Sequence, residues 1–333
     1  MALLNIQTPR SQVNLRSERL VVLVPDATGN QEQSSIPLAE LDRVVISQGV
    51  QVSGLALCEL LRRRVPVTFL AWNGRLLGSF EPPVPPRGAS RLLQYELART
   101  PASRLLIARK LIEAKISNGR RLLQRLDANH HRLEGEIMST FQMRERDAAT
   151  AADLATLRGH EGIAAALFFA GWAKFLPVEF PFGHRSTRPP GNSVNACLSY
   201  LSAIVYGELL TQCAVRGLDP ALGCLHESED GRWSLPLDLM EPFRPALIES
   251  LTLRVFSHRI LQCQHFEAHD GGVWLTLDGR RTLIQHYEQR VQREFLSEHI
   301  GCRTTLRQQL QNAAVHFKIA LGQPELFKPF RIN

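Results

Sequence analysis

The segment GCLHESEDGRWSLPLDLMEPFRP, residues 223–245, contains the side chains of this chain that could perform the most specific chemistry. His226 precedes a polar turn, and Asp238 and Glu241 lie three residues apart in an apolar, proline-rich stretch. If a helix begins near Pro236, both carboxylates lie on one face and can share a cation. Adjacent carboxylates repel each other unless they are protonated, ion-paired or metal-bound, so a metal site and an ion pair are both open explanations.

The two prolines that follow predict an irregular backbone at these acids. Pro242 and Pro245 have no N–H group, so in a continuous helix the carbonyl oxygens of Asp238 and Glu241 would lose their usual donors. We therefore expect the helix to kink or tighten there.

A third candidate ligand, Glu161, lies at the start of the apolar stretch EGIAAALFFAGW. Glu161, His226 and either Asp238 or Glu241 would form a mixed oxygen and nitrogen shell, which suits Mn²⁺ and is tolerated by Mg²⁺. Zinc is less suited because no thiolate or second histidine accompanies the set. Each residue also has an ordinary explanation, such as a helix-start carboxylate for Glu161 or an i+3 ion pair of Glu241 with Arg244.

A second cluster, SHRILQCQHFEAHD, offers a competing metal site. His265 and His269 are four residues apart and could chelate zinc on one helical face, as in a zinc hydrolase. The cluster lacks an HExxH arrangement, because Glu267 lies midway and off that face. We favour a solvated polar turn.

Composition and motifs narrow the class of protein. The chain has 333 residues and a formal net charge of +7, which makes nucleic acid a plausible partner. Phosphate-loop, dinucleotide-binding and serine-hydrolase motifs do not occur. No signal peptide or uninterrupted membrane-length apolar run is present, and the six cysteines have no paired spacing, so we expect buried, reduced thiols in a cytoplasmic protein without a membrane segment.

The elements that must position these residues change character along the chain. Residues 1–80 contain short runs rich in Val, Ile and Leu, with one helix near 53–64 and a hairpin signal at Asn73–Gly74, which predicts a small β-sheet domain. Residues 81–90 hold four prolines and a glycine and predict a linker. Residues 91–333 predict an all-α domain with a long loop at 174–192, so the fold class is α+β. The expected helices span approximately 105–126, 153–175, 193–216, 236–257 and 280–311.

The helix over 105–126 is amphipathic and basic. Apolar residues recur at helical spacing, and arginines occupy its other faces. We expect the segment 104–125, with Arg62, Arg63 and Arg64, to contact phosphates. The DNA-contacting candidates on this helix are Arg109, Arg120 and Arg121.

Several motifs in order resemble the CRISPR-associated spacer-acquisition integrases, the Cas1 family. IPLAELDRVVI with VPVTFLAWNGRLLGSF is similar to the family's N-terminal sheet domain, and RGHEGIAAALFF to its glutamate helix. NSVNACLSYLSAIVYGELLTQCAVRGLDPALGCLHES with SLPLDLMEPFRPALIES resembles its central region. GGVWLTLDGRRTLIQHYEQRV and LFKPFRIN resemble its C-terminal pattern. The resemblance therefore covers nearly the whole chain.

The resemblance implies a dimerising N-terminal β domain and an α-helical catalytic domain that binds Mg²⁺ or Mn²⁺. It transfers the metal ligands to Glu161, His226 and the acid pair, with Glu241 ranked ahead of Asp238. Tyr206 falls where the family often has an active-site or DNA-contacting tyrosine, and a buried helical aromatic is the alternative. Two departures are GNSVN, where the family commonly has Asp-Pro-Val-Asn, and His160 before the glutamate.

The implied activity is metal-dependent DNA integration with endonuclease activity. A 3′-hydroxyl of a short DNA fragment would attack a phosphodiester at a repeat of a CRISPR array. The implied partners are double-stranded and branched DNA, a second copy of the chain and a small dimeric protein, Cas2. The alternative is a catalytically silent DNA-binding scaffold in which the Glu, His and Asp side chains form a structural network.

Overall fold

The computed structural model describes residues 2–25, 31–72, 74–80, 87–128 and 131–333. The chain divides into two compact units, residues 1–85 and 86–333. The division falls inside the proline-rich segment 81–90, of which residues 81–86 lie outside the described part of the chain. Each unit has its own hydrophobic core.

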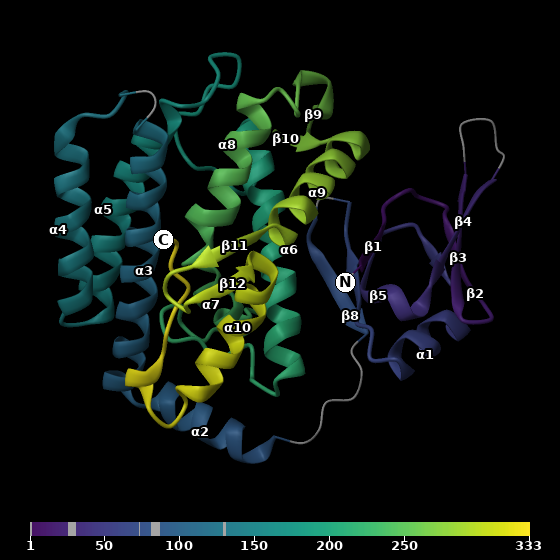
Figure 1. Ribbon diagram of the computed structural model, residues 1–333, viewed down its shortest axis with the longest axis horizontal. Coiled ribbons are helices and arrows are strands. Elements are labelled where there is room, and N and C mark those ends of the chain that lie inside the picture. Colours follow the sequence, from purple (N-terminus) through teal and green to yellow (C-terminus); the bar gives the residue numbers. More distant parts are fainter. Residues whose placement is uncertain (1, 26–30, 73, 81–86, 129–130) are drawn as a thin grey trace. The chain divides into compact units, whose positions relative to one another are not determined.

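The first unit contains two four-stranded sheets (Figure 1). One has the order β1-β5-β7-β8, with β1, β5 and β7 parallel and β8 antiparallel to β7. The other has the order β4-β3-β2-β6. The elements are β1 (Ala2–Ile6), β2 (Gln12–Arg16), β3 (Arg19–Pro25), β4 (Gln31–Pro37), η1 (Leu38–Glu40), β5 (Leu41–Ser47), β6 (Gln51–Val52), α1 (Gly54–Arg62), β7 (Val67–Leu70) and β8 (Leu76–Phe80).

This unit confirms the predicted sheet character of the N-terminal segment. The predicted helix near 53–64 is α1, whose first turn is capped by the Ser53 hydroxyl, which accepts a hydrogen bond from the Ala56 N–H at 3.3 Å. Strands β7 and β8 pair as predicted for a hairpin, although Asn73 of the turn lies outside the described residues. Leu20, Val44 and Leu60 are fully buried in its core.

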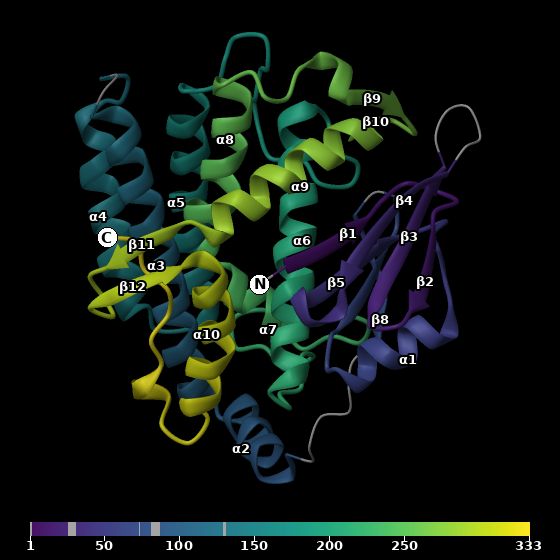
Figure 2. The ribbon, with the colours of Figure 1, turned by 45° about the vertical axis from the view of Figure 1, so that its right-hand side comes forward.

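The second unit is mostly helical (Figures 1 and 2). The fold is therefore α+β, as predicted, although this unit also has two small antiparallel hairpins, β9–β10 and β11–β12. Its elements are α2 (Gly88–Arg99), α3 (Pro101–Asp127), α4 (Gly135–Thr150), α5 (Leu154–Ala173), α6 (Ser193–Val215), α7 (Ser234–Met240), η2 (Arg244–Glu249), α8 (Ser250–Ser257), η3 (Cys263–His265), β9 (Phe266–His269), β10 (Gly272–Leu275), α9 (Leu277–Gln292), β11 (Glu294–Ser297), β12 (Cys302–Thr305), α10 (Leu306–Ile319) and η4 (Pro324–Leu326).

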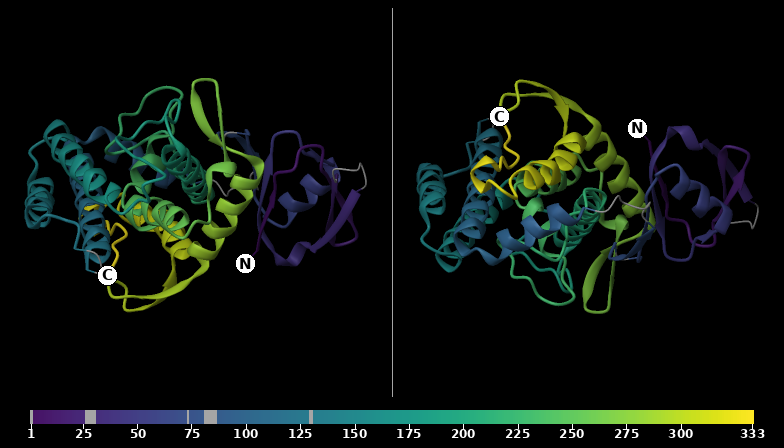
Figure 3. Two further views of the ribbon diagram at one scale, coloured as in Figure 1. Left: turned by 90° about the horizontal axis from the view of Figure 1, so that it is seen from above. Right: turned by 90° about the horizontal axis from the view of Figure 1, so that it is seen from below.

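Helices α3, α4 and α5 pack together at one margin of this unit, whereas α6 lies inside it (Figure 3). Asp153 and Asn192 cap the N-termini of α5 and α6, each accepting a backbone hydrogen bond at 2.8 Å. Helix α6 is apolar and long enough to cross a bilayer, but 67% of its most apolar window is buried inside the unit. It therefore serves as a core helix here.

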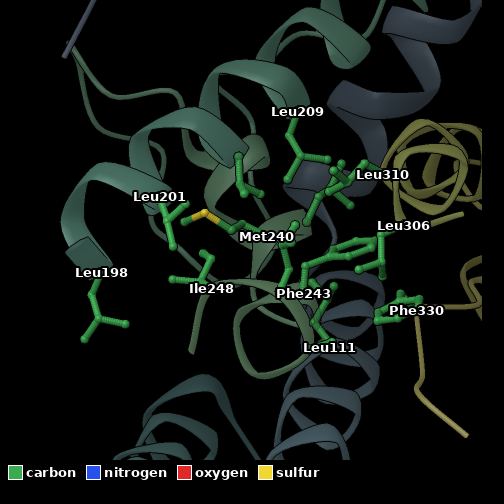
Figure 4. Close-up of a cluster of buried hydrophobic side chains, with 14 of the residues drawn as sticks. Leu111, Leu198, Leu201, Leu209, Met240, Phe243, Ile248, Leu306, Leu310 and Phe330 are labelled. Atoms are coloured by element: carbon green, nitrogen blue, oxygen red, sulfur yellow. The ribbon is translucent and has the colours of Figure 1, made fainter. Parts of the chain in front are cut away.

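The core joins α3, α6, α10 and the segment 324–333 around the end of α7 (Figure 4). Phe243 follows α7 directly and stacks on Phe330, with ring centroids 4.6 Å apart and an interplanar angle of 6°. Both rings are buried. The turn that carries Glu241 is therefore held by packing on both sides.

Two sequence predictions were wrong, the second of them in part. The helix expected over 280–311 is two helices, α9 and α10, separated by the β11–β12 hairpin. The strands are four residues each, too short for a period of two to stand out beside the helical pattern. The six cysteines are all free, but only Cys197, Cys213 and Cys224 are buried, whereas Cys58, Cys263 and Cys302 are exposed.

Candidate active site

The turn after α7 gives the two candidate acids, Asp238 and Glu241, different partners. Helix α7 ends at Met240, and the carbonyl oxygens of Asp238 and Glu241 accept i+3 hydrogen bonds from the N–H groups of Glu241 and Arg244, at 3.2 and 3.3 Å. A π-helical segment, η2, follows directly. The predicted tightening at the prolines is confirmed, and its consequence is that Asp238 and Glu241 do not face a common point.

Asp238 is fully buried, and its carboxylate is saturated with donors. Oδ2 accepts hydrogen bonds from the N–H groups of Cys224 and Leu225, at 2.5 and 2.9 Å. Oδ1 accepts from the His226 N–H at 3.0 Å and lies 2.6 Å from His226 Nδ1. Asp238 therefore folds the loop 224–226 around itself and has no oxygen left for an external ion.

The contact with Asp238 fixes the orientation of the His226 imidazole. An ionised carboxylate only accepts hydrogen bonds, so Nδ1 is the protonated nitrogen and Nε2 is the one with a free lone pair. The neighbouring Glu227 is held by Arg104 and Arg158, at 3.2 and 3.0 Å, which anchors the same loop. His226 therefore has Nε2 available as a hydrogen-bond acceptor or as a nitrogen ligand.

Glu161 and Glu241 converge on a single ammonium group. Nζ of Lys115 lies 2.5 Å from Glu161 Oε1 and 2.5 Å from Glu241 Oε2. Glu161 comes from the middle of α5, Glu241 from the turn after α7, and Lys115 from α3. Three segments far apart in sequence therefore meet at one positively charged point.

Glu241 is the more deeply embedded of the two acids. Its exposed fraction is 5%, and its Oε2 forms an ion pair with the Lys115 ammonium at 2.5 Å. Burial acts to raise the pKa of Glu241, but Arg244 and Lys115, with a smaller effect of the His226 imidazole, outweigh it and hold the pKa at about 2. The carboxylate is ionised at any physiological pH.

Helix α3 is locked in place beside the acid-bearing turn. The Asn118 side-chain amide, one helical turn after Lys115, donates to the carbonyl oxygens of Pro242 and Phe330, at 2.7 and 3.1 Å. Its Oδ1 accepts from the Ile332 N–H at 3.0 Å. Lys115 and the turn therefore have a fixed backbone separation.

A cavity of about 550 Å³ borders these charges. Its apolar wall includes Phe168, Phe169 and Ala164, and its polar wall includes Arg185, Arg244 and Glu249. Glu249 is buried, its Oε2 has no hydrogen-bond partner among the described residues, and burial raises its pKa to about 7 even though Arg244 lowers it. The acids thus lie at the wall of a space that other groups can enter.

The donor set fits a hard divalent cation. Two carboxylate oxygens, one from Glu161 and one from Glu241, already enclose one cation, the Lys115 ammonium. Oxygen-rich shells with one imidazole suit Mn²⁺ and Mg²⁺. Among the described residues, no three His, Cys, Asp or Glu side chains are gathered tightly enough to hold an ion, and the Lys115 ammonium lies between Glu161 and Glu241.

The competing zinc site is not supported by the fold. His265 ends the 3₁₀ turn η3 and His269 ends strand β9, so they do not share a helical face. His265 Nδ1 accepts from the Gln262 N–H at 2.9 Å, and His269 stacks on Trp274 with centroids 5.8 Å apart. His265 and His269 therefore make contacts within a turn and a hairpin, and they do not form a shared chelating face.

The residues predicted to contact DNA have different environments. The Arg109 guanidinium donates to the Ala151 carbonyl oxygen, and Arg120 pairs with Glu145 at 3.1 Å, so both tie α3 to α4. Arg121 is half-buried and forms no hydrogen bond or ion pair with another described residue. Tyr206 is half-buried against the core, which raises its pKa to about 12.

The other singled-out charges are also engaged locally. Arg62 and Arg63 pair with Glu59, at 2.8 and 2.6 Å. His160 Nδ1 lies 3.1 Å from the Arg144 guanidinium on α4. His160 therefore belongs to the α4–α5 contact.

Sequence reasoning missed Lys115 and a cluster of cations on α8 and α9. Lys115 could have been noticed as a lone charge in the apolar stripe formed by Ile112 and Ile116. Arg290 is half-buried and donates to the Ala246 carbonyl oxygen at 3.2 Å. Burial and the charges of Arg293, Arg254 and Arg125 lower its pKa, which indicates a strongly positive region.

Comparison with known families and proteins agrees with this geometry. A family profile described as CRISPR associated protein Cas1 matches residues 4–289. A CRISPR-associated endonuclease Cas1 of Thermus thermophilus is 32% identical over 329 residues, covering 98% of each chain. A Cas4/Cas1 exonuclease–endonuclease fusion of Rhodospirillum rubrum is 35% identical over 92% of this chain, which spans only 53% of the fusion's length.

Solved structures share the fold. A Cas1 protein from Thermotoga maritima superposes with a TM-score of 0.81 at 22% identity, covering 99% of this chain and all of the other. A casposase bound to integration product gives a TM-score of 0.87 at 21% identity, covering 100% of this chain and 93% of the other. At these identities the likeness concerns the fold.

Proposed function

The chain belongs to the CRISPR-associated Cas1 family, and on that premise we propose that it is a metal-dependent DNA endonuclease and integrase that inserts short DNA fragments into a CRISPR array. The observation that supports this most strongly is the convergence of Glu161 and Glu241 on one cationic position. Relatives at 32–35% identity are described as endonucleases, which supports the reaction class.

In this proposal, Glu161, Glu241 and His226 Nε2 hold one Mg²⁺ or Mn²⁺ ion. A bound divalent ion lowers the pKa of an attacking hydroxyl and offsets charge on the phosphorus and on the leaving oxygen. Asp238 holds the imidazole in the tautomer that leaves Nε2 free. Arg244 pairs with Glu241 at 3.0 Å and keeps that carboxylate ionised and oriented.

The protein's remaining task is to align the DNA strands. The reaction needs the 3′-hydroxyl of the incoming fragment in line with a phosphodiester of the repeat, so fixed positions on rigid helices are more useful than a covalent intermediate. Arg121, Tyr206 and the cations around Arg290 are the proposed DNA contacts. Arginines bind phosphates without reading sequence, which suits a substrate of variable sequence.

The proposed partners are double-stranded and branched DNA, a second copy of this chain and the small protein Cas2. A solved assembly described as a Cas6-RT-Cas1–Cas2 complex shares the fold. We assign dimerisation to the first unit, residues 1–85, which contains the predicted β domain at 1–80, as the family resemblance implies. The second unit, with its own core, then provides catalysis.

One observation favours a second candidate. The acids at the site are already neutralised by Lys115 and Arg244, as they would be in a catalytically silent DNA-binding scaffold. In the integrase, a metal ion would replace the Lys115 ammonium between the acids, whereas in the scaffold the ion pairs would persist. They are separated by measuring strand joining directly.

The test incubates the protein with Mn²⁺, a fragment with free 3′-hydroxyl ends and a supercoiled plasmid containing a repeat. We expect joined products from the wild type and from His265→Ala, which changes a histidine of the hairpin region. Glu161→Gln and His226→Ala should join no detectable DNA, because each removes a proposed ligand. No joined product from the wild type would support the scaffold instead, and undiminished joining by both of these variants would exclude Glu161 and His226 as the metal ligands of the reaction.

A further inference from the structure

Lys115 is the least expected residue at the site. Its ammonium lies between the two acids, at 2.5 Å from an oxygen of each. Burial acts to lower the pKa of Lys115, but Glu241 and Glu161 outweigh it and raise the pKa, so the group remains charged. A lysine in a metal-binding position is not required by the chemistry of the reaction.

An ammonium and a divalent ion cannot share this position. A Mg²⁺ ion lies about 2.0–2.1 Å from its oxygen ligands, so an ion bound by both carboxylates would stand almost where Nζ stands. A divalent ion and an ammonium group that close together would repel each other strongly in a poorly solvated site. Either the metal ion or the ammonium must leave.

The backbone of α3 cannot make that adjustment easily. Asn118 ties the helix to Pro242 and Phe330 through hydrogen bonds, and Leu111 and Ile112 are buried in the core. The Lys115 side chain, in contrast, has a flexible four-carbon stem and borders the cavity beside the acids. Displacement by side-chain rotation is therefore the available response.

We propose that Lys115 is an internal placeholder for the metal ion: its ammonium keeps Glu161 and Glu241 assembled in the metal-free protein and competes directly with Mn²⁺ or Mg²⁺ for them. Lys115 is a positioning residue in this role. It lowers the affinity for the ion while preventing the repulsion of two uncompensated buried carboxylates. The inference rests on the proposed metal site.

The test is calorimetric titration of the full-length protein with Mn²⁺ in the absence of DNA. We expect Lys115→Met to bind Mn²⁺ roughly 5- to 150-fold more tightly than the wild type, the usual range for coupled equilibria. The matched control is Lys110→Met, on the same helix, because Lys110 donates to the carbonyl oxygens of Glu325 and Phe327 and touches neither acid. The control should bind Mn²⁺ as the wild type does.

Failure of this inference differs from failure of the proposed site. If the wild type binds Mn²⁺ and Glu161→Gln does not, the site stands, and unchanged or weaker binding by Lys115→Met overturns the placeholder alone. If neither the wild type nor Lys115→Met binds Mn²⁺, the proposed metal site itself fails.

A second measurement needs only the wild-type protein and covers the case in which Lys115→Met does not fold. The chain has five lysines, Lys110, Lys115, Lys174, Lys318 and Lys328, so acetylation by acetic anhydride can be followed at each by peptide mass mapping. We expect Mn²⁺ to accelerate acetylation of Lys115 several-fold and to leave the other four rates unchanged. Equal or slower acetylation of Lys115 with Mn²⁺ would overturn the proposal.

Discussion

Asp238 and Glu241 show how neighbouring carboxylates acquire different tasks. Asp238 accepts hydrogen bonds from three backbone N–H groups and lies within hydrogen-bond distance of the His226 imidazole, so its carboxylate stabilises the loop 224–226. Glu241 directs a buried oxygen at the Lys115 ammonium, 2.5 Å away. Sequence spacing alone leaves open which of the two acids is the direct ligand. Their different partners favour Glu241.

Asp238→Asn is predicted to weaken Mn²⁺ binding by about 10- to 100-fold, the usual effect of losing the partner that orients a histidine ligand. Glu241→Gln should weaken it further, because a direct ligand loses its charge. Titration calorimetry of both variants measures the difference. A larger loss in Asp238→Asn than in Glu241→Gln would reverse the assignment.

Adjacent arginines on α3 provide a matched pair for DNA binding. Arg121→Ala should weaken binding to a DNA duplex and reduce the slope of log affinity against log salt concentration by about 1, as expected for one lost phosphate contact. Arg120→Ala should leave the slope unchanged and lower the urea midpoint of unfolding, because Arg120 pairs with Glu145. Equal slopes in Arg121→Ala and the wild type would exclude Arg121 from the interface.

At the scale of elements, the π-helical segment η2 turns a buried acid toward the site. Pro242 and Pro245 disrupt the regular helix, and the segment brings Arg244 to Glu241 and Glu249 to the cavity wall. Glu249 is buried with an unpartnered oxygen, so its ionisation at neutral pH opposes folding.

Glu249 gives a prediction about pH. Its pKa rises from 4.5 to about 7 on folding, mainly through burial, so the folded state binds more protons than the unfolded state between these values. The stability associated with neutral Glu249 is fully present below pH 4.5 and is lost as the pH rises through 7, by about 3 kcal/mol. Glu249→Gln should therefore stabilise the protein at pH 8 and change little at pH 4.5.

Urea unfolding at the two pH values measures this, with the exposed Glu136→Gln as the control. A stabilisation by Glu249→Gln that is the same at both pH values would show that titration of Glu249 is not its cause.

The elements also show what sequence reasoning can reach. Helix α3 has a long amphipathic pattern, whereas α5 and α6 are long apolar stretches whose N-termini are marked by the capping residues Asp153 and Asn192. The predicted bounds of all three are confirmed to within a few residues. The β11–β12 hairpin was missed because its strands are short and lie between two helical patterns. Lys115 was missed as a site residue because its partners, Glu161 and Glu241, are distant in sequence, and only the packed fold brings them together.

The whole molecule consists of two units with separate hydrophobic cores. All candidate ligands, Glu161, His226 and Glu241, lie in residues 86–333, together with Lys115 and Asp238. The proposed dimerisation belongs to the first unit.

A fragment of residues 86–333 is predicted to fold, because its own core is extensive. It should bind Mn²⁺ with the affinity of the full chain and be a monomer by size-exclusion chromatography with light scattering, whereas the full chain should be a dimer. A fragment that dimerises as the full chain does would move the dimer interface out of the first unit.

The most direct test of the central claim is an anomalous difference map from crystals of the full chain grown with Mn²⁺. The account predicts one strong peak within coordination distance of Glu161, Glu241 and His226 Nε2, with the Lys115 ammonium displaced from its position between the acids. A map with Lys115 still between Glu161 and Glu241 and the manganese peak elsewhere would contradict it.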